Sequence, residues 1–165
     1  MPIPRIIWAL AALFVSSSAA PPARPLPVVQ PNDNRLAAGV LRHDTLTLRL
    51  VVVMARWYPE RPGGPFADVP VFAEEGRAPQ VPAPLIRVPV GTTLRVSVRN
   101  ALADFISLMS GLATHPLDSV VPVPVPPGTA RTFVFAAGQP GTYLYVAAPG
   151  TVNPDSTEQQ QLGGA

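Results

Sequence analysis

The side chains best suited to binding a metal are two histidines, His43 and His115, and two methionines, Met54 and Met109. Two imidazoles and two thioethers would make a suitable ligand set for copper. The histidines are 72 positions apart, and neither an H-x-H nor an M-x-x-M spacing occurs. Both methionines fall in strand-like runs, where methionine usually fills the core. His115 and His43 are therefore the candidate metal ligands, and two solvated loop histidines are the simpler interpretation.

An enzyme that acts alone has little support in these residues. The chain has no cysteine, and no serine lies in a G-x-S-x-G turn. The glycine-rich segment Arg61–Pro65 lacks a lysine and a following helix, so it predicts a turn and no phosphate site. The acidic residues that could pair fall in loops, where a solvated carboxylate is the usual case: Glu74, Glu75, Asp104, Asp118, Asp155 and Glu158. We expect no catalytic residue in this chain by itself.

The charge distribution argues against a nucleic-acid partner. All 12 basic residues are arginine, the net charge is +2, and the arginines are dispersed along the chain. Such a pattern provides no basic stripe that could follow a phosphate backbone. The absence of cysteine also excludes disulfides and thiolate metal ligands. Neither nucleic-acid binding nor a disulfide framework is expected.

The first 31 residues have the layout of an export signal and a spacer. Met1–Ala20 contains a basic start at Arg5, the apolar run Ile6–Val15 and a small-residue end, which is typical of a secretory signal peptide. The apolar run is shorter than the roughly 20 residues of a membrane-spanning helix. An uncleaved anchor is the alternative. The proline-rich residues Pro21–Pro31 predict an extended linker. We expect a secreted or periplasmic protein with no membrane span after cleavage.

The remaining chain is dominated by alternating apolar and polar residues. In Leu85–Asn100, two such runs meet at Val90–Thr92, and the second places Leu94, Val96 and Val98 on one face, the period of a half-buried strand. Frequent proline and glycine make long helices improbable. We expect an all-β fold with further strands or extended segments at Thr45–Met54, Val71–Ala73, Phe105–Met109, Ser119–Val125, Thr129–Phe135 and Thr142–Val146, and an irregular crossing at Arg56–Pro70.

Three segments, in this order, resemble the N-terminal cupredoxin (plastocyanin-like) domain of the multicopper oxidase family. They are PAPLIRVPVGTTLRVSVRN at Pro82–Asn100, FISLMSGL at Phe105–Leu112 and VPPGTARTFVFAAGQPGTYLYVAA at Val125–Ala148. Family members have similar P-G-P-x-I-x-V, H-W-H-G-L and G-T-x-W-Y-H-S-H motifs in the same order. The resemblance implies a Greek-key β-sandwich over residues 32–165.

The resemblance also implies where copper ligands would lie. In the family, this domain supplies two histidines from H-W-H-G and two from H-S-H to a copper cluster. The matching positions here are Leu108 and Ser110 in the first motif, and Val146 and Ala148 in the second. Type 1 copper needs a cysteine thiolate, which the chain lacks. The family's copper centres are therefore not expected, although some members carry extra histidines near the position of His115.

The C-terminal end departs from the family pattern. Members continue through a segment similar to Q-x-G-L-x-G-P-F-V-V, whose apolar residues form a closing strand. Here Gln161–Ala165 reaches that place and the apolar residues do not follow. We therefore expect an incomplete domain that lacks its last strand and has an open sheet edge available to another chain. A piece of a longer oxidase and a single domain with a partner are both compatible with this pattern.

Three functions follow from these observations. The first is an exported cupredoxin-like domain without copper ligands, acting as a structural or docking part beside further cupredoxin domains or another protein chain. The second is an exported copper-binding electron carrier or oxidase component that uses His115 and His43. The third is a generic β-sandwich binding module. The first predicts that positions 108, 110, 146 and 148 lie together without a histidine.

Overall fold

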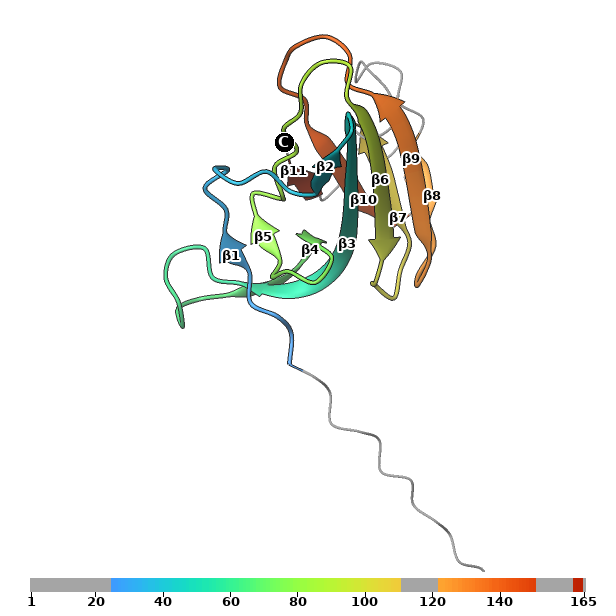
Figure 1. Ribbon diagram of the computed structural model, residues 1–165. Helices are drawn as coiled ribbons and strands as arrows, with labels where there is room; N and C mark the ends of the chain where they lie inside the picture. Colours follow the sequence, from blue (N-terminus) through green and yellow to red (C-terminus); the bar gives the residue numbers. More distant parts are fainter. Residues whose placement is uncertain (1–24, 111–121, 151–161, 165) are drawn as a thin grey trace, which may run out of the picture.

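The computed structural model describes residues 25–110, 122–150 and 162–164, and within them every regular element is a strand. Figure 1 shows two layers of strands, with a small pair of strands beside them. The elements are β1 (Gln30–Pro31), β2 (Val40–Arg42), β3 (Thr45–Trp57), β4 (Ala67–Glu74), β5 (Gln80–Val81), β6 (Thr93–Asn100), β7 (Ile106–Ser110), β8 (Val123–Val125), β9 (Ala130–Ala136), β10 (Tyr145–Pro149) and β11 (Leu162–Gly164). The predicted all-β sandwich is confirmed.

The first sheet has the order β2-β3-β6-β9, with β4 also paired to β3. The predicted alternation places Leu46, Leu48, Leu50 and Val52 of β3 in the core, next to Leu94, Val96 and Val98 of the parallel neighbour β6. The predicted strand at Thr45–Met54 is confirmed and continues to Trp57. Met54 is 36% exposed, because it follows Val52 on the face of β3 that leaves the main cluster, whereas Val53 and Ala55 on the other face pack in a second, smaller cluster.

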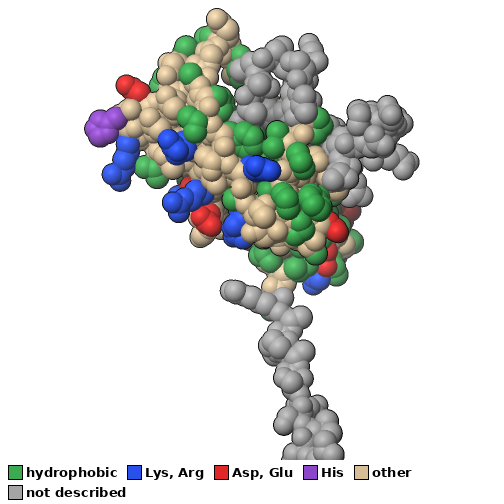
Figure 2. All heavy atoms as spheres, turned by 90° about the vertical axis from the view of Figure 1, so that its right-hand side faces the viewer, with side chains coloured by type: hydrophobic (Ala, Val, Ile, Leu, Met, Phe, Trp, Pro, Cys, Tyr) green, Lys and Arg blue, Asp and Glu red, His purple; other side chains and the backbone are tan. Residues whose placement is uncertain are grey.

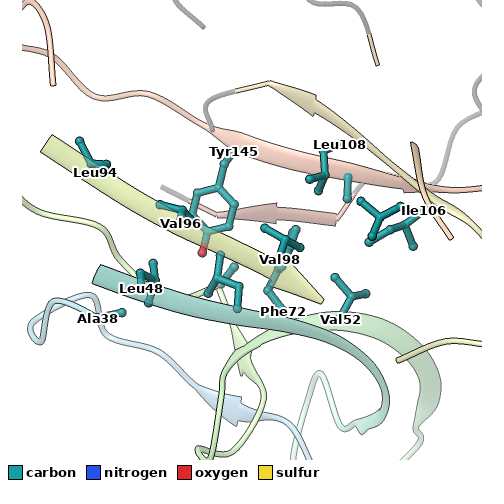
Figure 3. Packing of buried hydrophobic residues seen from close by; sticks show 14 of the residues in the cluster. Ala38, Leu48, Val52, Phe72, Leu94, Val96, Val98, Ile106, Leu108 and Tyr145 are labelled. Carbon is teal, nitrogen blue, oxygen red and sulfur yellow. The ribbon is translucent and has the colours of Figure 1, made fainter. Parts of the chain in front are cut away.

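The second sheet has the order β11-β10-β7-β8 and covers the first. It contributes Ile106, Leu108, Val125, Tyr145 and Ala147 to the same apolar cluster. Figure 3 shows Tyr145 and Leu108 extending from one layer toward Val96, Val98 and Phe72 in the other. The Tyr145 and Phe72 rings meet edge to face, with centroids 5.2 Å apart at 70°. Burial of this apolar surface stabilises the contact between the sheets.

The expected irregular crossing at Arg56–Pro70 is wrong at both ends, because β3 continues to Trp57 and β4 begins at Ala67, and only residues 58–66 form a loop. β3 and β4 form an antiparallel pair in which Arg56 lies opposite Asp68 and Met54 lies opposite Pro70. A proline is tolerated here because β4 is bonded to β3 alone within its sheet. The Arg56 side chain donates to both carboxylate oxygens of Asp68, at 2.9 and 3.2 Å, and stacks on Phe66. These contacts hold the end of the hairpin together.

Asn100, at the end of β6, is a fully buried polar residue. Its amide nitrogen donates to the carbonyls of Asp104 (2.7 Å) and Val125 (2.9 Å), and its side-chain oxygen accepts from the Leu102 amide (2.9 Å). All three bonds join segments that enter the second sheet. Asn100 therefore fixes the path of the chain from the first sheet to β7 and β8.

The proline-rich segment expected to be a linker joins the fold over its last residues. Val28 bridges to Arg56, Val29 is 8% exposed, and β1 pairs in parallel with β5. The boundary expected at residue 32 is thus preceded by residues that pack on the domain. A short strand can pair at an edge even when it is rich in proline, because only alternate main-chain groups face its neighbour.

Other differences lie at strand ends. The first run of the central segment, Leu85–Pro89, has no assigned strand, so only its second run is confirmed, as β6. The strand expected at Thr142–Val146 begins three residues later, as β10. At the C-terminal end, β11 pairs with β10, so a short strand lies where an open edge was expected. No helix in the described part of the chain is long and apolar enough to cross a membrane.

Candidate functional site

The four positions implied by the copper-ligand motifs lie on neighbouring strands. In the pairing of β7 with β10, Val146 lies opposite Ser110, Ala147 opposite Leu108, and Ala148 opposite Ser107. The register shifts between Val146 and Ala147, which marks a bulge at this point. The strands thus bring the two motifs together, although the motifs are more than 30 residues apart in the sequence.

The pleat of these strands places side chains at the four positions on different faces of the sheet. Leu108 is 3% exposed and belongs to the core cluster together with Ala147, its partner on β10. Because successive side chains alternate between faces, Ala148 lies on the opposite face, beside Ser107. Ser107 is buried there and donates its hydroxyl to the Gly150 carbonyl at 2.9 Å. Leu108 and Ala148 therefore do not point to a common site.

The donor chemistry at these positions does not fit copper. Leu108, Val146 and Ala148 have no side-chain donor atom, and Ser110 has only a neutral hydroxyl. Copper sites in proteins are built from imidazole, thiolate and thioether ligands. No group of three or more His, Cys, Asp or Glu side chains in the described residues could hold a metal ion.

His43 occupies a turn. It lies with Asp44 between β2 and β3, and both residues have positive φ, 44° and 59°. A two-residue hairpin loop with two positive φ angles is a type I′ turn, and histidine and aspartate tolerate this conformation better than most residues. Figure 2 shows the purple histidine projecting at one end of the molecule. The other candidate, His115, lies outside the described residues.

Comparisons with known proteins agree with the motif order. A sequence model of multicopper oxidases matches residues 76–164, more than half of the chain. A search of curated proteins found no match. Among solved structures, a laccase from Pediococcus acidilactici is 18% identical with a TM-score of 0.47 and covers 81% of this chain and 27% of its own. A Campylobacter jejuni multicopper oxidase described as a metallo-oxidase is 20% identical, with a TM-score of 0.43 and coverages of 76% and 26%.

The chain thus spans about a quarter of the length of these solved oxidases. The matched region of the family model includes β6 and β9 of the first sheet and all four strands of the second, and it carries the resembling motifs. The chain belongs to the multicopper oxidase family.

Proposed function

We propose that the chain is an exported cupredoxin-like domain that works without the copper ligands of its family, as a structural or docking part of a larger assembly. The observation that carries this proposal is the set of side chains at the four motif positions: Leu108, Ser110, Val146 and Ala148. A site that had only lost one ligand would retain other imidazoles nearby. Here the whole set is replaced, and Leu108 serves the apolar core instead.

The packing around these positions supports a structural role. Leu108 and Ala147 face each other across β7 and β10 and join the cluster that binds the two sheets. An imidazole at position 108 would have to enter this apolar cluster, and an unpaired polar group there would be costly. Leu108, at one of the four motif positions, therefore stabilises the sandwich without a metal.

Two observations support a partner and an exported location. The solved oxidases are about four times as long as the matched region of this chain, so further cupredoxin domains, or another chain that carries them, are the proposed neighbours. Residues 1–20 have the basic, apolar and small-residue order of a secretory signal. The protein would then act outside the cytoplasm, after removal of this segment.

Copper binding by the purified mature chain tests the proposal. The chain is incubated with Cu(I) under reducing conditions and with Cu(II) under oxidising conditions, dialysed, and assayed for bound copper and for thermal stability. We expect no copper above background and no change in melting temperature. Stoichiometric binding that is lost in His115→Ala or His43→Ala would contradict the proposal and favour the copper carrier.

A further inference from the structure

A cleft of about 290 Å³ is lined by two connections between strands, one before β6 and one before β10. Both connections lie toward the top of Figure 1. One wall is the segment Leu85–Val90, which leads from β5 to β6, and the other is Gly138–Tyr143, which leads from β9 to β10. Leu94, Phe135 and Tyr145 also line it. The cleft is thus apolar at its base and bounded by main chain on both sides.

The first wall has the properties of an unpaired strand. The consecutive residues Leu85–Val88 all line the cleft. This is expected when a cleft runs along the edge of an extended segment, because both side-chain faces then border it. Within it, Ile86 and Val88 pack against the core while Arg87 between them is exposed. The Leu85 carbonyl accepts from Ala38. In the described structure, the amides and carbonyls of residues 86–88 have no hydrogen-bond partner. These unbonded groups leave the segment able to pair with an added strand, as the edge strand of a sheet can.

The second wall is preformed. The Tyr143 hydroxyl donates to the Gln139 carbonyl at 2.9 Å, which closes the turn that precedes β10. Gly141 lies directly beneath this ring, so that a Cβ there would be 2.7 Å from the Tyr143 hydroxyl. The turn therefore holds its shape without a ligand. A segment that binds in the cleft would therefore not incur the entropic cost of ordering this wall.

Charge distinguishes between the possible occupants. Among the described residues, Arg87 is the sole charged side chain that lines the cleft, and no acidic residue there forms an ion pair with it. A second copy that added the same edge would bring Arg87 toward its own counterpart, and like charges on paired strands are destabilising. An occupant with a carboxylate opposite Arg87 would instead gain an ion pair.

We propose that the cleft accepts an extended segment of another polypeptide, which adds as a β-strand along residues 86–88. Its main chain would bond to the free groups of this edge, and its alternate apolar side chains would fill the cleft. A carboxylate between those apolar residues would face Arg87. This assignment rests on the proposed docking function and specifies the surface and the chemistry of the partner.

The probe is a fluorescein-labelled heptapeptide, Val-Thr-Val-Glu-Val-Thr-Val, acetylated and amidated at its ends and titrated against the mature chain by fluorescence anisotropy. We expect saturable binding. A peptide with Lys in place of Glu should bind about fivefold more weakly, the upper range for an exposed ion pair. In Arg87→Glu, the preference should reverse in favour of the Lys peptide. Arg95→Glu is the matched control, because Arg95 is an exposed arginine on β6 that does not line the cleft.

Main-chain bonding is tested separately with two peptides N-methylated at alternate residues. Alternate amides of a strand point to opposite edges, so one of the two should lose binding. Equal binding by both, no saturable binding at all, or an unchanged preference in Arg87→Glu would each overturn the proposal. If the chain binds neither peptide nor copper, the proposed docking surface is wrong, and the proposed copper-free domain still stands. If the chain binds both copper and peptide, the copper-free assignment is wrong, and the docking surface still stands.

Discussion

Replacement of Tyr145 by phenylalanine tests how the two sheets are held together. Tyr145 is 2% exposed, packs edge-on against Phe72, and donates its hydroxyl to the Pro84 carbonyl at 2.6 Å. Tyr145→Phe keeps the ring and removes this bond from the buried contact between β10 and the segment before residue 85. We expect the free energy of unfolding near neutral pH to fall by about 1 kcal/mol.

The same substitution should have the opposite effect at high pH. Burial raises the pKa of Tyr145 well above its usual value, because the phenolate would lose its hydration. The folded protein then keeps a proton that the unfolded chain releases above about pH 10, so the stability present below that pH is lost as the pH rises. The loss approaches about 1.4 kcal/mol per pH unit. Phenylalanine has no such loss, so the two stability curves should cross at about pH 10.6.

The assay is urea unfolding of both proteins, followed by circular dichroism in steps from neutral to strongly alkaline pH. The composition suits this measurement, because lysine, cysteine and tyrosine are the side chains that titrate at alkaline pH. The chain has no lysine or cysteine and has three tyrosines. Tyr143→Phe makes the same chemical change at a residue that is 40% exposed and is the matched control. If the difference between Tyr145→Phe and the natural protein stayed constant through the alkaline range, the phenol would not be shielded from water and the reasoning would fail.

Three further comparisons test the fold. Asn100→Ala removes the three hydrogen bonds of a buried side chain and should cost about 3 kcal/mol in urea unfolding; a loss below 1 kcal/mol would contradict this account. Gly39→Ala, at φ +85° with its Cβ 2.9 Å from a carbonyl oxygen, should lower the melting temperature more than Gly91→Ala, at φ +83° in open space. The Arg56 hydrogen bond lowers the pKa of Asp68, so that ion pair stabilises the protein above the usual aspartate range and is lost as the pH falls. Asp68→Asn should therefore flatten the acid limb of the stability profile, and an unchanged limb would contradict it.

The strands that depend on local alternation could be predicted from the sequence. Leu46, Leu48 and Leu50 alternate with polar residues, and Leu94 and Val96 do the same, so β3 and β6 appear where their residues indicate. The short strand predicted at Val71–Ala73 is confirmed as part of β4, but residues 67–70 were missed because Pro70 argues against a strand unless its partner is known. The run at residues 85–89 also alternates, but it forms no strand because no neighbouring strand pairs with it. Periodicity shows which face is apolar and does not show which edge is paired.

The candidate site was predicted only in part. The motif order places the two copper-ligand segments on adjacent strands, and the register of β7 with β10 agrees with this. The opposite orientation of Leu108 and Ala148 depends on the pleat and the bulge, which the motifs do not specify. His43 was considered as a ligand, whereas its place before Asp44 between two short apolar runs is also the pattern of a tight hairpin turn.

The contact between Phe72 and Tyr145 has a consequence for the order of folding. β3 and β4 are neighbours in the chain and can pair as soon as both exist, but their apolar face is covered by β7 and β10, which follow much later. Until then, the hairpin exposes Leu48, Val52 and Phe72 to water. Long-range pairing of this kind slows folding, so a chain emerging from a ribosome or a translocation pore should stay open until its last third has appeared.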